Sequence, residues 1–290
     1  MSRVPVEDWV QVGPDRFRVR GWPALVPTDV AVIIHHGLGE HGGRYSVFAE
    51  QLAGVPAHIW TFDARGHGES DGVRGRVGGL QELTTDFEAL LPDLIARSGA
   101  SRVVVYGHSM GAAAVAWYLT HRSVHEAIAG VWLSAPPTVV TLTAQMRVKA
   151  AAARVLNRLM PWLTLASGLP QTGISSVAAE VESYRADPLI HDRISAALAW
   201  SLLTDAPTLM ESARKITLPA LLWHGGADPI ADRRGTEGVF AALGSEDRAL
   251  RIIEGAMHEV HRETAPIAGE LFDMLREWLA SRVPPPHEGG

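Results

Sequence analysis

The chain has 290 residues, with 26 lysine and arginine residues against 32 aspartate and glutamate residues, a formal net charge of −6. This length allows one large α/β domain or two small ones, and the acidic balance argues against nucleic acid or an anionic membrane as the main partner. Cysteine is absent, which excludes disulfides and thiolate chemistry and suits a reducing cytoplasm, so we expect a cytoplasmic location.

The first third of the chain predicts strands, a helix and long polar loops. MSRVPVEDWV carries charge and proline where a secretory signal needs an apolar core, and residues 1–28 are typical of a polar strand or hairpin. Short apolar runs bounded by turn residues predict buried strands over 29–34 and 58–62. Apolar residues at helical spacing predict a helix over 79–97.

The central stretch RVVVYGHSMGAAAVAWYLT (102–120) changes from β-branched to alanine-rich residues at Gly107-His-Ser-Met-Gly111. This G-x-S-x-G pattern predicts a sharp turn from strand to helix that projects the hydroxyl of Ser109 above a parallel sheet. Glycine is needed at 107 and 111 because a β-carbon there would collide with a neighbouring strand or helix.

Beyond a further strand at 130–133, the composition changes at about residue 138 to alanine- and leucine-rich pieces without a convincing strand, including 154–162 and 194–203. Strands resume at 218–223 and 249–253, followed by a helix over 266–281 and a tail (284–290) that we expect to be frayed. Strands that alternate with helices predict an α/β fold with a mostly parallel sheet and helices on both faces. We therefore assign 1–137 and 215–290 to the core and 138–214 to an inserted helical cap.

A serine nucleophile needs a base, and the base needs an acid that fixes its tautomer. With this type of serine turn, the acid and then the histidine follow along the chain. Asp228 and His258 each come directly after a predicted strand, so we predict a triad of Ser109, Asp228 and His258. Asp228 precedes a proline and could instead form only a turn. His261 competes with His258, which lies nearer the strand end.

Two backbone N–H groups are needed to stabilise the negative oxygen of the transition state. Met110, directly after the serine and at the start of the helix, is one candidate. Leu38, which lies between two glycines after the 29–34 strand, is the other. The side chains of both residues could alternatively be no more than pocket wall.

The histidines at 35, 36, 41, 67, 258 and 261 raise the question of a metal site. His258 and His261 are three residues apart, whereas H-E-x-x-H needs four, and the spacing around His41 matches no ligand pattern. We therefore predict no metal site.

The chain resembles the monoacylglycerol lipase and lysophospholipase-like branch of the α/β-hydrolases in six blocks: HHGLGEHGGRY (35–45), FDARGHGESDG (62–72), GHSMGA (107–112), YRADPLI (184–190), HGGADPI (224–230) and EGAMHEVHRE (254–263). The resemblance implies an α/β-hydrolase fold, a cap over an apolar acyl tunnel, and cofactor-free hydrolysis of a monoacylglycerol to fatty acid and glycerol. It implies the same triad and the same oxyanion donors, Leu38 and Met110.

The resemblance also implies a polar pocket for the alcohol, formed by Glu40, Arg44, His261 and, from the cap, Tyr184. Glu40 and Arg44 could instead be an ion pair that holds their loop.

Basic residues of the cap (Arg147, Lys149, Arg154 and Arg158) alternate with apolar ones (Val155, Leu156, Leu159, Met160 and Trp162). This pattern is compatible with transient contact with a membrane or micelle surface. An apolar face turned down onto the tunnel, with the basic face in water, fits a helical cap better.

Other functions of the same residues remain open. A lysophospholipase, a general carboxylesterase or an acyltransferase would use the same triad, and a ligand-sensing protein could keep the triad only to bind a carbonyl. A proline peptidase would need an acidic pocket for the substrate amino group, for which Glu40 is the candidate.

Overall fold

The computed structural model describes residues 3–139 and 144–282, with the backbone only for 144–150 and for 152. The main sheet has the strand order β1-β2-β4-β3-β5-β6-β9-β10. Its strands are β1 (Val6–Val12), β2 (Asp15–Trp22), β3 (Val30–His35), β4 (His58–Phe62), β5 (Arg102–His108), β6 (Ile128–Ser134), β9 (Ala220–Gly225) and β10 (Arg248–Ile253). The pairs β1/β2 and β2/β4 are antiparallel and the other pairs are parallel.

The central strands are apolar because helices cover them on both sides. Every residue of β3 and of β9 is buried. In the register of the sheet, His35 pairs with Gly107 and His108 pairs with Ser134, so β3, β5 and β6 end at the same edge. The loops that carry the predicted site residues leave the sheet at this edge.

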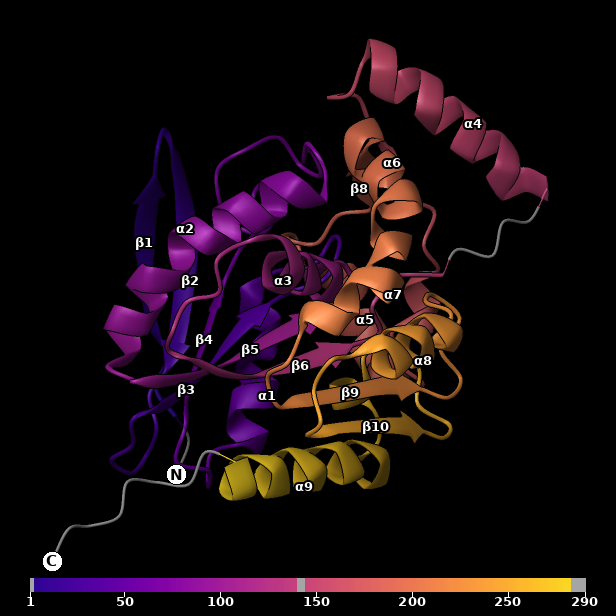
Figure 1. Cartoon of the computed structure of the whole chain (residues 1–290). Coiled ribbons are helices and arrows are strands. Elements are labelled where there is room, and N and C mark those ends of the chain that lie inside the picture. Colours follow the sequence, from indigo (N-terminus) through magenta and orange to yellow (C-terminus); the bar gives the residue numbers. More distant parts are fainter. Residues whose placement is uncertain (1–2, 140–143, 283–290) are drawn as a thin grey trace, which may run out of the picture.

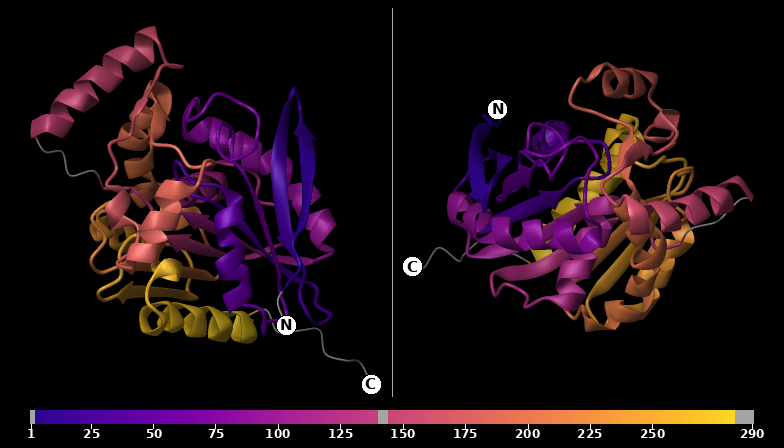
Figure 2. Two further views of the ribbon diagram at one scale, coloured as in Figure 1. Left: turned by 180° about the vertical axis from the view of Figure 1, so that it is seen from behind. Right: turned by 90° about the horizontal axis from the view of Figure 1, so that it is seen from above.

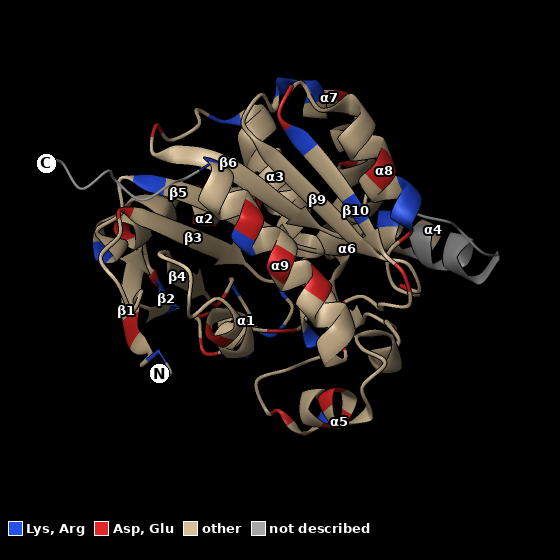
Figure 3. Cartoon of the chain, turned by 90° about the horizontal axis from the view of Figure 1, so that it is seen from below, with Lys and Arg blue, Asp and Glu red and all other residues tan. Residues whose placement is uncertain are grey.

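Helices lie on both faces of the sheet, as predicted (Figure 1). One face is covered by α2 (Leu80–Ser98), α3 (Met110–His121), α7 (Leu209–Ser212) and α8 (Arg233–Ala242). The other face is covered by α1 (Ser46–Gln51) and α9 (Ala265–Arg282), which lie across the sheet when it is seen from below (Figure 3). Each face has its own apolar core, which includes Phe87 on the first face and Phe272 on the second.

The segment between β6 and β9 is not purely helical, which corrects the prediction. It contains α4 (Ala144–Leu159), β7 (Thr164–Ala166), α5 (Ala178–Ala186), β8 (Arg193–Ser195) and α6 (Ala196–Thr204). The strands β7 and β8 form a small antiparallel sheet. Helix α4 ends at Leu159, before Pro161, and α6 begins at Ala196 because the Ser195 side chain caps it by accepting from the N–H of Leu198. The predicted pieces 154–162 and 194–203 therefore crossed element boundaries.

Helix α4 extends away from the sheet and packs against α6 (Figures 1 and 2). Short 3₁₀ turns complete the chain: η1 (Gly42–Tyr45), η2 (Gln171–Gly173), η3 (Ala206–Thr208), η4 (Ala213–Lys215) and η5 (Val260–Arg262). Among the described residues, no helix combines the length and the apolar character needed to cross a bilayer. The tail predicted to be frayed, 284–290, lies outside the described residues.

Candidate active site

Ser109 lies at a strained turn between β5 and α3, as the G-x-S-x-G pattern predicts. Its φ and ψ angles are 53° and −117°, a conformation that only a tightly packed surrounding maintains. A β-carbon on Gly107 would lie 2.4 Å from the carbonyl oxygen of Gly111, and one on Gly111 would lie 2.1 Å from that of His35. Close packing of the strand and the helix on this turn therefore requires both glycines.

Asp228 and His258 lie in the loops after β9 and β10 and contact each other. The Nδ1 atom of His258 is 2.6 Å from Oδ2 of Asp228. The other carboxylate oxygen of Asp228 accepts the backbone N–H groups of Ile230 and Ala231. Because Nδ1 of His258 donates to the carboxylate, its Nε2 is left as a proton acceptor. Ser109 and His258 line the same cavity.

The ionisation of this pair follows from its surroundings. Burial opposes charge on both groups, yet their mutual attraction outweighs it. The pKa of Asp228 is held far below its usual value by His258, with a hydrogen bond from His224 adding to the effect. Although burial alone would lower it, the pKa of His258 is raised above 6.5 by Asp228. By contrast, burial and the neighbouring His258 lower the pKa of His108 to about 3, so that ring stays neutral.

The loop after β3 carries Leu38 to the same cavity and is held by hydrogen bonds at both ends. His36 accepts the N–H of Ala64 at Nε2 (2.8 Å), so its Nδ1 is protonated and donates to the carbonyl of Gly37 (2.7 Å). The N–H of Gly37 donates to Oε1 of Glu40 (2.6 Å). The loop backbone therefore has little freedom to rotate. Met110, the other predicted donor, is the first residue of α3.

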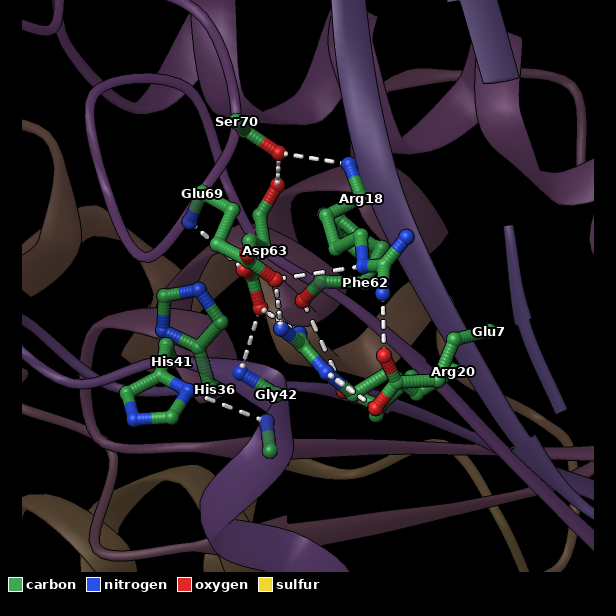
Figure 4. A network of polar contacts seen from close by, with 12 residues as sticks. Glu7, Arg18, Arg20, His36, His41, Gly42, Phe62, Asp63, Glu69 and Ser70 are labelled. Carbon is green, nitrogen blue, oxygen red and sulfur yellow. Dashed lines mark hydrogen bonds and ion pairs between the residues drawn. The ribbon is translucent and has the colours of Figure 1, made fainter. Parts of the chain in front are cut away.

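A buried ion pair supports this loop from the side of β4 (Figure 4). Asp63 accepts the N–H of Gly42 (2.8 Å) and pairs with Arg20 (2.6 Å) through Oδ1, and its Oδ2 accepts the N–H of Glu69 (2.8 Å). A β-carbon on Gly68 would lie 2.1 Å from Oδ2 of Asp63, which explains the second glycine of FDARGHGESDG. The loop after β4 is thereby fixed against the loop that carries Leu38.

The predicted alcohol-side residues occupy two layers. Glu40 and Tyr184 line the cavity at Ser109, whereas Arg44 and His261 do not. Arg44 contacts both wall residues: its Nε lies 3.4 Å from Oε2 of Glu40, and its guanidinium lies over the Tyr184 ring, 4.6 Å from the centroid. His261 is stacked on Tyr45 behind the wall. The ion pair between Glu40 and Arg44, which the sequence left as an alternative, is present alongside the pocket position of Glu40.

Glu259 is a wall residue that sequence reasoning missed. It directly follows His258, lines the cavity and accepts a hydrogen bond from Nη2 of Arg44. Burial and the neighbouring charge of Glu40 raise the pKa of Glu259, although the positive charge of Arg44 acts to lower it. Its position next to the predicted base was the signal available in the sequence, where EVHRE offers two acids and one arginine.

Hydrogen bonds join the cap to the loops that carry His258 and Leu38. The N–H groups of His258 and Glu259 donate to the carbonyls of Gly173 and Ile174. His191 donates its N–H to the carbonyl of Gly39 (3.0 Å). Residues 171–195 of the cap therefore form part of the wall of the site, and the sequence alone did not reveal these contacts.

The cavity at Ser109 is small, about 40 Å³, which leaves room for a few water molecules and not for a glycerol ester. A separate groove of about 950 Å³ lies between α4 and α6. Its apolar lining comes from Val139, Ala151, Val155, Leu159, Trp200, Leu203, Pro207 and Met210. The groove shares no lining residue with the cavity.

Within residues 3–139 and 144–282, no group of three or more His, Asp or Glu side chains could together hold a metal ion.

Comparison with known proteins identifies the family. The family described as serine aminopeptidase, S33, matches residues 27–265. The chain belongs to this family. Monoglyceride lipase from Homo sapiens is 29% identical over 272 residues, which are 91% of this chain and 86% of the relative. A phospholipase of Bacillus subtilis is 29% identical over 260 residues, 88% of this chain and 96% of the relative.

Among solved structures, the monoacylglycerol lipase of Paleococcus ferrophilus superposes with a TM-score of 0.81 at 31% identity, covering 92% of this chain and 99% of that one. The protein is thus a monoacylglycerol lipase-like α/β-hydrolase, as the sequence blocks predicted. Its fold is confirmed as an α/β-hydrolase sheet with an inserted cap.

Proposed function

We propose that this hydrolase cleaves the ester bond of monoacylglycerols to fatty acid and glycerol. The observation that carries the proposal is the convergence of Ser109 on its strained turn with the bonded pair of Asp228 and His258. His258 removes the Ser109 proton as the oxygen attacks the ester carbonyl, and Asp228 stabilises the imidazolium that forms. The family relatives named monoglyceride and monoacylglycerol lipases support the substrate.

The remaining steps use backbone groups and water. The N–H groups of Leu38 and Met110 bind the negative oxygen of the tetrahedral intermediate. Collapse of this intermediate breaks the ester bond, and His258 returns the proton to the departing glycerol oxygen. Water, deprotonated by the same imidazole, then attacks the acyl group on Ser109 and releases the fatty acid.

Binding of the substrate uses both sides of the site. On the alcohol side, Glu40 and Tyr184 contact the glycerol, and Arg44 holds both of these residues in place. His261 acts through Tyr45, on which it stacks and whose hydroxyl donates to Glu40. On the acyl side, the groove between α4 and α6 takes the chain once the cap has moved. Its apolar lining, which includes Val155 and Leu203, supports this assignment.

The direct test is product analysis with 1-monooleoylglycerol. Release of oleate and glycerol in equal amounts over many turnovers supports hydrolysis. An oleate ester of an added alcohol as the main product would instead identify an acyltransferase, and labelling of Ser109 without turnover would identify a ligand-sensing protein. Oleate release from lysophospholipids or simple esters at higher kcat/KM would favour the lysophospholipase or carboxylesterase alternatives.

An aminopeptidase is a second candidate because the cavity wall holds two carboxylates, Glu40 and Glu259, and a substrate amino group needs an acidic wall. The cavity does not by itself distinguish an amide from an ester. Hydrolysis of a proline amide faster than of 1-monooleoylglycerol would favour this function.

We also propose that the cap touches lipid aggregates. Four large apolar residues of α4 and the segment after it are exposed: Val155, Leu159, Met160 and Trp162. Arg154 and Arg158 are exposed beside them, which favours an anionic lipid surface. The side chains of Arg147 and Lys149 lie outside the described residues. The cytoplasmic location stays a prediction.

A further inference from the structure

Glu259 shares the catalytic cavity with Ser109, and its position is fixed from two sides. Its backbone N–H donates to the carbonyl of Ile174 in the cap (2.7 Å). Its side chain, in a residue only 3% exposed, pairs with Arg44. A carboxylate held in this way cannot swing out of the cavity wall.

The positive charge of Arg44 is already used by the protein. Its Nη2 donates to Glu259, its Nε faces Glu40, and Tyr184 covers one face of the guanidinium. The carbonyl of Arg44 accepts from Arg262, whose Nη1 in turn pairs with Glu180 of the cap (2.5 Å). Arg44 is buried and does not line the cavity. Its N–H groups are therefore not placed at the cavity, where they could donate to a substrate phosphate.

Glu40 and Glu259, unlike Arg44, line the cavity. A β-carbon on Gly37 would lie 3.0 Å from Oε1 of Glu40 and 3.4 Å from Cβ of Ser109, so the Glu40 carboxylate lies close to the nucleophile. Oε2 of Glu40 is buried, makes no hydrogen bond among the described residues, and lies 3.4 Å from Nε of Arg44. A carboxylate oxygen has two lone pairs, so one remains available to a donor. A hydroxyl or ammonium group can donate to such a wall, whereas an anion there is repelled at short range in a weakly screened site.

We propose that Glu259 and Glu40 form a leaving-group subsite that accepts esters of neutral polyhydric alcohols and of protonated amino alcohols and rejects esters whose alcohol carries a phosphate. This inference rests on the proposed ester hydrolase function and adds the charge class of its substrate. It separates this protein from an enzyme for anionic lysophospholipids, an alternative that the Bacillus subtilis relative keeps open. The phosphate ester is rejected because the two carboxylates repel its phosphate, rather than because the substrate loses favourable contacts.

The test uses three octanoate esters that differ in the charge of the alcohol. They are 1-octanoylglycerol, 1-octanoylglycerol 3-phosphate, and 2-(dimethylamino)ethyl octanoate, which is cationic and cannot transfer its acyl group to nitrogen. We expect kcat/KM for the phosphate ester to be roughly 100-fold below that for 1-octanoylglycerol, and the cationic ester to lie within about tenfold of it. Equal values for the neutral and phosphate esters would overturn the inference and leave the proposed function standing.

The variant Glu259→Gln tests whether Glu259 causes the discrimination between the neutral and phosphate esters. The ratio of kcat/KM between the neutral and phosphate esters should fall about tenfold, whatever the change in absolute rates. Glu182→Gln, which removes the same charge from an exposed position of α5, should keep the wild-type ratio. An unchanged ratio in folded Glu259→Gln protein would contradict a role for Glu259. If that variant fails to fold, the three esters with wild-type protein still decide the charge class.

A binding measurement makes the inference independent of turnover. Glycerol and 2-(dimethylamino)ethanol at matched ionic strength should slow fluorophosphonate labelling of Ser109 more strongly than glycerol 3-phosphate does. Stronger protection by glycerol 3-phosphate would overturn the inference. Failure to hydrolyse 1-octanoylglycerol would count against the proposed function alone.

Discussion

The imidazole of His258 and the carboxylate of Asp228 lie 2.6 Å apart, although the two residues come from loops after different strands. This contact raises the pKa of His258 above 6.5, although burial acts against the charged form. A general base must be neutral to accept a proton, so activity falls as pH decreases through this raised pKa. The acidic limb of the kcat/KM profile should therefore lie above pH 6.5.

Asp228→Asn tests this electrostatic role. Removal of the negative charge lowers the pKa of His258, so the acidic limb of the profile should move to lower pH. Loss of the correct tautomer should reduce kcat by about 10⁴. The measurement is a pH series of kcat/KM with a soluble short-chain ester. Asp232→Asn, in the same loop and at the start of α8, should leave both quantities close to wild type. A limb that does not move would contradict the assignment of Asp228.

Val155→Glu tests the groove between α4 and α6 as the acyl site. The valine lines the groove and is 56% exposed, so the variant should fold. A carboxylate beside the acyl chain should lower kcat/KM for monooleoylglycerol by about tenfold or more and leave a butyrate ester nearly unaffected. Val124→Glu changes a valine that is 40% exposed and does not line the groove, and should affect neither substrate. Equal losses on both chain lengths would argue against the groove.

Asp63→Asn tests the support of the loop that carries Leu38. The variant breaks a buried ion pair with Arg20, which costs about 3–5 kcal/mol of unfolding free energy. We expect the melting temperature to fall by roughly 10 °C. Asp71→Asn removes the exposed pair with Arg16, and its melting temperature should hardly change. Equal melting temperatures for the two variants would contradict the structural role of Asp63.

Trp162→Asp tests contact of the cap with lipid. The indole is exposed beside Met160 and outside the groove between α4 and α6, so removing it weakens binding to a surface without touching the acyl site. Co-sedimentation with phosphatidylglycerol vesicles should decrease, and hydrolysis of vesicle-borne monooleoylglycerol should fall more than hydrolysis of a dissolved short-chain ester. Wild-type protein that stays in the supernatant would rule out the lipid contact.

Much of the core could be predicted because the structure of these segments follows from residues that are close together in the sequence. The apolar run 29–34 is a strand because helices cover both sides of the sheet, and the structure has β3 at Val30–His35. The turn at Ser109 follows from two glycines that no other residue can replace. Asp228 and His258 could be placed because each directly follows a strand, and parallel strands end at the same edge of a sheet.

The cap and the second layer of the site could not be predicted in the same way. Strands β7 and β8 have three residues each and depend on pairing with each other across a long intervening segment, so neither has a periodic signal of its own. Arg44 and Glu259 are 215 positions apart, and their contact depends on tertiary packing. The sequence showed two acids near His258 without showing which one faces the cavity.

In the proposed mechanism, the Oγ atom of Ser109 carries the acyl group. The most direct measurement is intact-protein mass spectrometry after brief mixing with a slowly hydrolysed octanoate ester, combined with steady-state assays of Ser109→Ala. We predict a transient mass increase of one octanoyl group on wild-type protein, none on the variant, and loss of turnover by several orders of magnitude in a variant that folds normally. Near wild-type turnover in folded Ser109→Ala protein, or an octanoyl group on another residue, would contradict the account.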